Sequence, residues 1–453
     1  MSSRFKFGLV ILFVIGVLLR LPNLDSPREI IFDEIYFGKF ATSYCCSYDS
    51  IFDIHPPHAK LLIAGTAKLF GHQPGFDFKG IGTRFTPEFA VFGMRLIPAL
   101  AGALIPCFAM IMISQLGGGI AAAFFGGFLL TWESAFWIQS RIITLDSILI
   151  AFFLAALIAA IWSLQKESIS KRCVGLLGCG ALSGLAVGSK FTGLACLPLI
   201  GVLLIWGTFR AKNTNRFLLL GRYTLWFASG FSAIYLAGWW IHFRLLNLPG
   251  PGDAFFRPSG RFFQDVVDLH RIMFEKNAGI TTLHPYASHW YEWPIMKRPV
   301  FYWNAGDRFI YLLGNPVVWY GVFVAFLASA IAWTCTVAQL FLHRDWLGLK
   351  HVTGTFSFSA VAVCFMPLMQ VARPLFLYHY FPTFVFMTIS SCLVLPNIAI
   401  LSRFGRNPIF KHVYIWACIM TVLGFIAVLP MTGMTNLASG YRDWVYFQIP
   451  SWR

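Results

Sequence analysis

Charged residues are scarce in this chain of 453 residues and make up only 12% of it. Hydrophobic residues account for 57% and the mean hydropathy is +0.67, values well outside the range of ordinary soluble domains. The chain also lacks an internal repeat, a low-complexity linker and a C-x-x-C motif. We therefore expect an integral membrane protein in which most of the ten cysteines serve packing.

Acidic residues are also few, with 19 against 35 lysines and arginines, so the formal net charge is +16. The basic residues lie at the ends of apolar runs and in loops, and no basic stripe or nucleic-acid-binding module is present. Membrane topology and anionic lipid headgroups account for most of this charge, which leaves a minority of external basic residues for an anionic ligand. No nucleic-acid partner is expected.

The apolar runs are each near the roughly 20 residues that cross a bilayer as a helix. They predict an all-α polytopic membrane protein with about eleven transmembrane helices. Basic residues gather in the loops of one side, so the N-terminus is expected in the cytoplasm and the C-terminus outside. No small-x-small cleavage site follows the first run, which predicts a retained span. The predicted spans are residues 5–21, 90–114, 118–138, 142–163, 173–189, 191–209, 223–243, 317–341, 353–372, 376–396 and 412–432.

Two large external loops, residues 22–89 and 244–316, belong to a single membrane-embedded domain that covers residues 1–453. In the first loop, the residues from His58 to Gly71 predict an amphipathic helix at the membrane surface. The second loop contains the aromatic run HPYASHWYEWP, which either forms an interfacial belt or stacks against sugar rings. Cys45 and Cys46 are adjacent and external, where they either form disulfides or pack.

Two carboxylates, Asp33 and Glu34 in the stretch FDEIYFG, are the most informative feature of the first loop. A half-buried carboxylate can have a raised pKa, and a general base must reach the proton that it removes. Either residue is a candidate base for an acceptor hydroxyl. The alternative is that one of them caps or salt-bridges an interfacial helix.

A second group of ionisable residues follows in the stretch DIHPPHAK. The two prolines after His55 hold the backbone extended, as suits a binding loop. Lys60 is a candidate for contacting a phosphate, with snorkelling to the interface as the alternative. A metal site formed by Asp53, His55 and His58 fits no standard zinc spacing.

Further ionisable residues occur at the external ends of the spans. An arginine costs on the order of 2–3 kcal/mol at the membrane centre and less near the interface, so Arg95 is expected to pair with a carboxylate of an outer loop. Arg141, Asp146 and Lys190 converge on the same membrane face. Such a cluster suits a lipid phosphate, and mutual ion pairing without a ligand is the alternative.

Taken together, these motifs resemble the protein O-mannosyltransferases, the dolichyl- or polyprenyl-phosphate-mannose–protein mannosyltransferases. The resemblance covers nearly the whole chain, because HPYASHWYEWP and RPLFLYHYFP are similar to the C-terminal membrane region of that family. The motifs of the first half occur in the family's order and spacing: FDEIYFGKFA, DIHPPHAKLL, FGMRLIPALAG, QSRIITLDS and GLAVGSKFTGL.

The resemblance implies a GT-C glycosyltransferase fold with a polyprenyl- or dolichyl-phosphate sugar as donor. The implied reaction transfers the sugar, with mannose expected, to Ser or Thr hydroxyls of proteins by an inverting displacement. Asp33 would be the base, with Glu34 beside it. The residues expected near the donor phosphate are Arg141, Lys190 and Lys60, and those expected to support the site are His55, Arg95, Asp146, His284 and Glu292.

No cofactor is expected to be required, because fixed cations can stabilise the developing negative charge, and a divalent cation is the alternative. The eukaryotic enzymes carry a β-trefoil MIR module in the second long loop, which is too short here to contain one. This favours a bacterial-type member in the inner membrane, with its site facing outside. Departures from the family at His58 and Thr144 leave the acceptor and the sugar open.

Two alternatives to this function are retained. In the first, a lipid-linked sugar is transferred to a lipid, as the aminoarabinose transferases do. In the second, the chain binds or transports polyprenyl phosphates without transfer, although no inverted repeat of a transporter is present. The oligomeric state is open.

Overall fold

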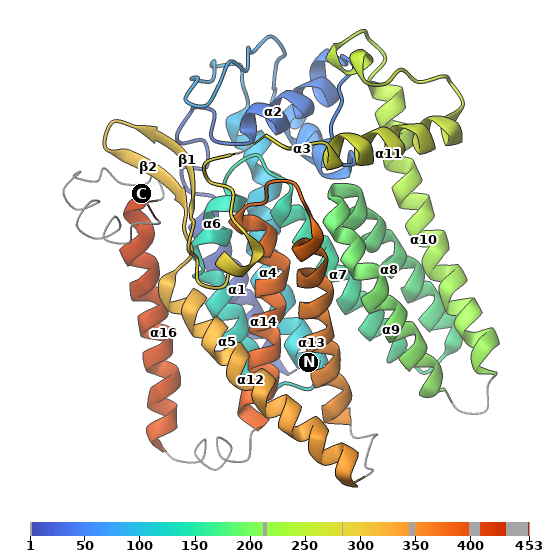
Figure 1. Cartoon of the computed structure of the whole chain (residues 1–453), viewed down its shortest axis with the longest axis vertical. Helices are drawn as coiled ribbons and strands as arrows, with labels where there is room; N and C mark the ends of the chain where they lie inside the picture. Colours follow the sequence, from blue (N-terminus) through green and yellow to red (C-terminus); the bar gives the residue numbers. More distant parts are fainter. Residues whose placement is uncertain are drawn as a thin grey trace.

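The computed structural model describes residues 2–211, 215–282, 284–343, 349–397, 408–431 and 452. Long helices run side by side, and the two large loops form a cap at one end of them (Figure 1). The helices of this bundle are α1 (Ser3–Arg20), α4 (Val91–Gln115), α5 (Ile120–Thr131), the short α6 (Ser134–Ser140), α7 (Asp146–Leu164), α8 (Ile169–Ser189), α9 (Cys196–Phe209), α10 (Arg216–Leu245), α12 (Pro316–His343), α13 (Leu349–Phe365), α14 (Phe381–Val394) and α16 (Pro408–Val428).

Nine helices within these described ranges are long and apolar enough to cross a membrane. The pair α5 and α6, bent by 59° at the break between them, makes a tenth candidate. Together with α1, which carries three basic residues, these elements account for the eleven predicted spans. The last predicted span ends at residue 432, outside the described residues. The chain is therefore a multi-pass integral membrane protein, and the predicted helical class is confirmed.

Close packing of the spans depends on small residues. Helices α4, α7 and α14 are the most buried spans, whereas α10, α12 and α16 lie at the periphery. Between α8 and α10, a Cβ atom on Gly180 would lie 2.0 Å from the carbonyl oxygen of Phe227, and one on Gly230 would lie 2.0 Å from that of Leu177. Only glycine permits this backbone approach, which brings the two helices together.

The predicted division of the apolar stretch 173–209 is confirmed. At Lys190 the backbone is extended (φ −155°, ψ 144°), so α8 ends there and a short 3-10 helix, Phe191–Ala195, leads into α9. In Figure 1 the marked N-terminus lies among the helices on the side away from the cap. Trp452, near the other end of the chain, instead donates its indole N–H to the carbonyl oxygen of Met296 in the cap. An odd number of spans places the two ends in this way.

The cap contains short helices and one β-hairpin. The hairpin was not predicted from the sequence. The first loop contributes α2 (Glu34–Thr42) and α3 (His58–Leu69), and the second contributes α11 (Phe262–Ala278). The hairpin pairs β1 (Val300–Ala305) antiparallel with β2 (Arg308–Leu312), from Val300 opposite Leu312 to Ala305 opposite Arg308.

The helix predicted at His58 to Gly71 exists as α3, but it does not simply lie on the surface. Its buried residues include His58, Lys60 and Ile63, and the helix contacts α2, α4 and α8. The adjacent residues Cys45 and Cys46 form a disulfide with each other, which answers the question that the sequence left open.

Candidate functional site

Asp33 lies at the start of α2 with its carboxylate unengaged. Its side chain makes no capping hydrogen bond, and no ion pair or side-chain hydrogen bond involves it in the described part of the chain. The preceding residue, Phe32, has φ 45°, a left-handed conformation that is a genuine outlier for a bulky side chain. Phe32 stacks on Tyr302 of β1 with ring centroids 4.2 Å apart and donates its N–H to the Tyr302 carbonyl. The surroundings therefore hold a strained turn that presents Asp33.

Burial controls the protonation of Asp33. It raises the pKa of the carboxyl from 3.8 to about 7, and the nearby positive charge of Lys190 partly opposes the rise. Asp146 and Asp53 raise the Asp33 pKa further, while Arg373 lowers it. These interactions place Asp33 in one electrostatic cluster with Lys190, Asp146 and Arg373. A carboxylate with a pKa near neutrality suits a general base.

Glu34, unlike Asp33, has a carboxylate that is fully engaged in buried contacts. Its carboxylate forms a fully buried bidentate pair with Arg95, with distances of 2.7 and 2.8 Å. The same two oxygens accept the N–H groups of Ile31 and Ile143. The expectation that Glu34 acts beside Asp33 in catalysis is corrected, because its oxygens are saturated. The alternative of a salt-bridging carboxylate applies to Glu34 and not to Asp33.

Arg95 ties the acidic loop to the second span, as expected. Besides Glu34, its guanidinium donates to the carbonyl oxygens of Leu24, Pro27 and Glu29. All of these acceptors belong to the first large loop. Arg95 thus fixes the segment on which Asp33 lies.

Lys190 is held by a chain of hydrogen bonds. Its ammonium lies 2.7 Å from one oxygen of Asp146, and the other oxygen of Asp146 accepts from Gln139 at 2.8 Å. The Gln139 carbonyl oxygen accepts from the hydroxyl of Tyr302 at 2.6 Å. Lys190 and Asp146 therefore pair with each other, and the expected place of Lys190 near the donor phosphate stays a prediction. The chain connects them to Tyr302, on which Phe32 stacks.

Two predicted phosphate ligands are engaged elsewhere. The Arg141 guanidinium donates to the carbonyl oxygens of Leu19, Arg20, Pro22 and Asn23, so it clamps the chain after α1. Its assignment near the donor phosphate stays a prediction, and the backbone acceptors that occupy its N–H groups favour a structural role instead.

Lys60 likewise stays a predicted phosphate ligand, although it already has partners. It is buried, paired with Asp53 and bonded to the carbonyl oxygen of His55. Burial holds the pKa of His55 well below its usual value, and the charges of Lys190 and Lys60 lower it further. The ring is therefore neutral at physiological pH. Because Lys190 also acts on Asp33, His55 belongs to the same electrostatic cluster.

His58 serves packing, which explains its departure from the family's usual leucine. The ring fits between two glycines, since a Cβ atom would lie 2.2 Å from it on Gly188 and 2.3 Å from it on Gly238. Its Nε2 bonds to the carbonyl oxygen of Ile234 in α10. In the described part of the chain, Asp53, His55 and His58 are not brought together as a group of potential metal ligands.

Among the described residues, the one group of potential metal ligands is Cys45, Cys46 and His72. The two sulfurs are bonded to each other, and both ring nitrogens of His72 have partners, Thr42 and the N–H of Ala90. This group does not fit a metal in its present state.

Arg373 is the residue that the sequence reasoning missed. It interacts electrostatically with Asp33, and it makes no ion pair with any residue of the described ranges. Its Nε is buried without a hydrogen-bond partner. The signal was available in the motif RPLFLYHYFP, in which Arg373 is the one basic side chain of an external turn.

A cavity of about 570 Å³ lies beside Arg373. Two predicted residues line it, His284 and Glu292, together with Trp290 and Arg298. His284 is exposed and contacts Phe376, which in turn contacts Phe32. Glu292 forms an ion pair with Lys297 and accepts the N–H of His289, so it orders the wall of the cavity.

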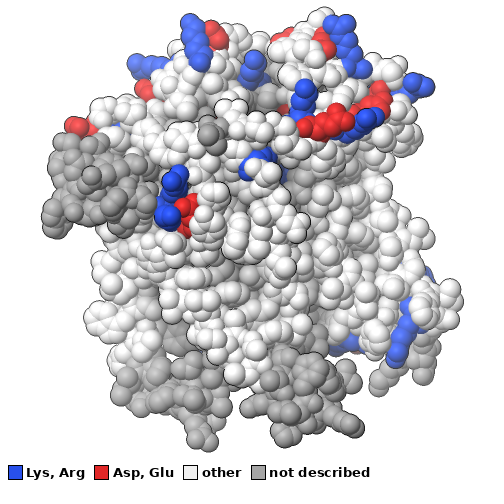
Figure 2. Space-filling view, in the orientation of Figure 1, with Lys and Arg blue, Asp and Glu red and all other residues white. Residues whose placement is uncertain are grey.

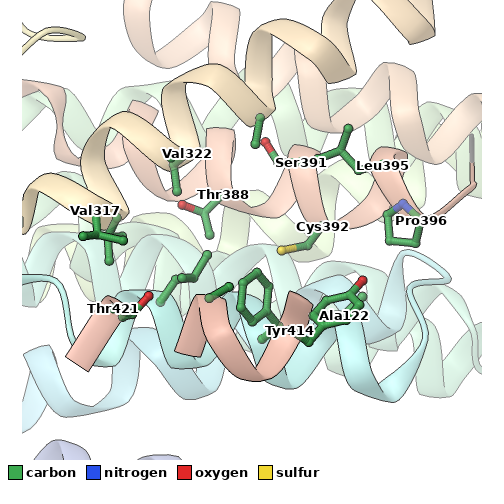
Figure 3. A pocket seen from close by; sticks show the side chains of 16 residues that line it. Ala122, Val317, Val322, Thr388, Ser391, Cys392, Leu395, Pro396, Tyr414 and Thr421 are labelled. Carbon is green, nitrogen blue, oxygen red and sulfur yellow. The ribbon is translucent and has the colours of Figure 1, made fainter. Parts of the chain in front are cut away.

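A second cavity, of about 320 Å³, lies among α5, α12, α14 and α16 (Figure 3). Its lining is mostly apolar, and it includes the hydroxyl-bearing residues Thr388, Ser391, Tyr414 and Thr421. None of the predicted site residues lines it. This cavity is therefore separate from the cluster around Asp33.

Comparison with known proteins identifies the family of this chain. Residues 10–247, more than half of the chain, match the model of the family described as dolichyl-phosphate-mannose-protein mannosyltransferase. Residues 262–450 match the model of the C-terminal four-transmembrane region of protein O-mannosyltransferases.

Curated relatives agree with these matches. Dolichyl-phosphate-mannose–protein mannosyltransferase 1 of Saccharomyces cerevisiae is 33% identical over 267 residues, which cover 56% of this chain and 32% of the relative. Protein O-mannosyltransferase 1 of Drosophila pseudoobscura pseudoobscura is 32% identical over 254 residues, covering 54% of this chain and 27% of the relative. The matched region thus spans about a third of the length of these relatives.

Solved structures share the fold. The S. cerevisiae protein O-mannosyltransferase Pmt1–Pmt2 complex bound to the sugar donor superposes with a TM-score of 0.89 at 18% identity, over 100% of this chain and 94% of the other. ArnT from Cupriavidus metallidurans gives 0.53 at 17% identity, over 98% and 74%. Both likenesses support the predicted GT-C architecture. On the strength of the family matches, this chain belongs to the dolichyl-phosphate-mannose-protein mannosyltransferase family.

Proposed function

We propose that this protein transfers a mannosyl group from polyprenyl- or dolichyl-phosphate mannose to a Ser or Thr hydroxyl of an acceptor protein. Family membership supports the class of reaction, and the names of the curated relatives carry this donor and acceptor. The reaction would take place in the cap, on the side opposite the N-terminus of α1. The short second loop favours a bacterial inner membrane with the cap outside.

The observation that carries the proposal is the unengaged carboxylate of Asp33 with a pKa of about 7. Near neutral pH this group is partly ionised, so it can accept a proton and later release it. Glu34 and Asp146 cannot take this role, because Arg95 and Lys190 already engage them. Asp33 is therefore the base of the proposed reaction.

The chemical step is a single displacement. The carboxylate of Asp33 accepts the proton of the acceptor hydroxyl while the hydroxyl oxygen attacks the anomeric carbon of the sugar. The bond between this carbon and the phosphate oxygen breaks, and the lipid phosphate leaves with the electron pair. The configuration at the anomeric carbon inverts, and no external oxidant, reductant or base is required.

Arg373 and Lys190 would stabilise the negative charge that develops on the phosphate. Arg373 lacks a counter-ion in the described ranges, and its pKa is lowered by burial, so an anionic ligand would restore a lost interaction. Lys190 is oriented by Asp146 and Gln139. Fixed cations in a buried site stabilise a transition-state charge strongly. The proposal therefore needs no metal, and a divalent cation is the alternative source of positive charge.

The test is transfer of radiolabelled mannose from polyprenyl-phosphate mannose to a Ser/Thr-rich peptide by the purified protein. We expect label on the peptide with the wild type and not with Asp33→Asn. Label on a lipid fraction instead would select the lipid acceptor, as in the aminoarabinose transferases. Donor binding without transfer to any acceptor would overturn the proposal in favour of a binder or transporter.

A further inference from the structure

Helix α11 of the cap packs on the rest of the chain through one face. Val266, Leu269 and Met273 of this face are buried against Trp239 of α10. These residues recur at the spacing of helical turns, and they form a small apolar cluster that is separate from the main core. This contact fixes which sides of α11 point away from the protein.

A second apolar stripe on α11 is exposed. Phe263, Val267 and Phe274 are spaced by four and seven positions, so they lie on one side of the helix, next to the packed face. Their side chains are 71%, 63% and 50% exposed. Large apolar side chains that line one side of a surface helix are unusual in contact with water and mark an interaction surface.

The remaining side of α11 is polar. Gln264 donates to Asp268, and Arg271 pairs with Glu275, in each case one helical turn apart. The helix therefore has a packed face, an exposed apolar stripe and a polar stripe in succession around its axis. This is the pattern of a helix that lies in the plane of a membrane interface.

The exposed stripe continues into the surface of a transmembrane span. The ring of Phe274 stacks on Phe191 with centroids 4.7 Å apart, and Phe191 leads into α9. Along the span Phe191–Phe209, which is apolar enough to cross a bilayer, Leu194 of the 3-10 helix is 42% exposed and Val202 of α9 is 52% exposed. An exposed apolar surface on such a helix faces lipid.

The position of α11 along the long axis of the molecule agrees with an apolar surface that continues from α11 onto the spans. Figure 1 shows it across the cap-side ends of α8 and α9. Figure 2 shows charged side chains gathered towards both ends of the molecule, with an uncharged belt between them and charged groups over α11 at the upper edge of that belt. The helix thus lies at the boundary between the uncharged belt and the charged cap.

We propose that α11 is an in-plane membrane helix whose stripe Phe263, Val267 and Phe274 is inserted among the acyl chains of the leaflet on the cap side. The polar stripe then meets headgroups and water. Since Phe274 contacts Phe191, the residue after Lys190, this lipid contact lies next to the candidate site. The inference does not depend on the proposed reaction, because it concerns the bilayer and not a substrate.

The test places an environment-sensitive fluorophore on single cysteines of the full-length protein in lipid nanodiscs. Two free cysteines that are not buried, Cys335 and Cys418, are first replaced by serine. Quenching is then measured with lipids that carry a doxyl group on the acyl chain and, separately, with aqueous iodide. The stripe variants are Phe263→Cys, Val267→Cys and Phe274→Cys, and the matched controls on the polar stripe are Gln264→Cys, Arg271→Cys and Glu275→Cys.

We expect quenching by the doxyl lipids to be about threefold or more stronger on the apolar stripe than on the controls, and quenching by iodide to show the reverse order. Equal quenching of both stripes by iodide would overturn the proposal, because the stripe would then face water. Weak quenching by both agents would also overturn it and would indicate cover by protein, such as a second copy of the chain. If Phe274→Cys fails to fold for lack of its stacking partner, the exposed positions Phe263 and Val267 still decide the outcome.

Discussion

Replacing Asp33 by asparagine should abolish transfer and at the same time stabilise the fold. Asparagine keeps the shape of the side chain but accepts no proton at neutral pH, and loss of a general base slows a reaction by about 10²–10⁴-fold. The gain in stability has a separate cause. Folding removes the charged carboxylate from water without supplying a partner, so the ionised form is disfavoured in the folded state.

The pKa sets the magnitude. A rise from 3.8 to about 7 corresponds to about 4 kcal/mol of unfavourable free energy once the group is ionised in both states. A carboxyl whose pKa is raised in the folded state does not destabilise the fold below its unfolded pKa near 4. The loss of folding free energy grows as the pH rises from there towards 7. By this linkage the wild type should be less stable than Asp33→Asn by about 2 kcal/mol at pH 5 and about 4 kcal/mol at pH 8. Because the Asp33 side chain is partly exposed, water weakens the effect of burial, and these two stability differences are upper limits.

The assay is thermal unfolding of both proteins in detergent at pH 5 and pH 8, alongside peptide mannosylation at pH 8. Asp77→Asn is the matched control, because Asp77 lies in the same loop with its side chain 72% exposed. This control should change neither transfer nor melting temperature. The reasoning is refuted if Asp33→Asn melts at the wild-type temperature at pH 8, or if its advantage does not grow with pH. Retained transfer would independently remove Asp33 as the base.

Three further predictions follow from the same site. Glu34→Gln should lower the free energy of unfolding by about 3–5 kcal/mol, because it leaves Arg95 buried without its counter-ion, and a melting temperature equal to that of the wild type would contradict the structural role. Arg373→Ala should raise the KM for the donor about tenfold or more with little change in melting temperature, because its buried Nε has no hydrogen-bond partner to lose among the described residues. Arg141→Ala should instead lower the melting temperature, because it removes hydrogen bonds to backbone carbonyls. If Arg141→Ala raised the KM and Arg373→Ala lowered the melting temperature, Arg141 would be the donor ligand and Arg373 the structural residue. Transfer by the wild type should rise with pH through about 7 as Asp33 ionises, and a rate that falls over pH 6–8 would argue against a base with that pKa.

Membrane spans could be predicted from sequence because each depends on its own composition. A run of about 20 apolar residues satisfies its backbone hydrogen bonds within one helix, whatever its neighbours are. Even the division at Lys190 was visible as a polar interruption in an apolar stretch. The β1–β2 hairpin was missed, although the two-residue turn Gly306–Asp307 between its strands is a local signal of a hairpin.

The sequence by itself determined the helical membrane class, the two large loops and the family, since these follow from local composition and from motifs that are read in order. It also selected the acidic pair and the cluster at Asp146 and Lys190. Only the tertiary structure decided which carboxylate of the pair is engaged. Asp33 and Glu34 are neighbours in the chain, but the start of α2 directs one side chain to Arg95 and leaves the other without a partner. The same cause separates the cations: Arg141 meets backbone carbonyls and Lys60 meets Asp53, while Arg373 keeps a buried Nε without a partner. The partner of a charge depends on distances between segments far apart in sequence, and only folding sets those distances.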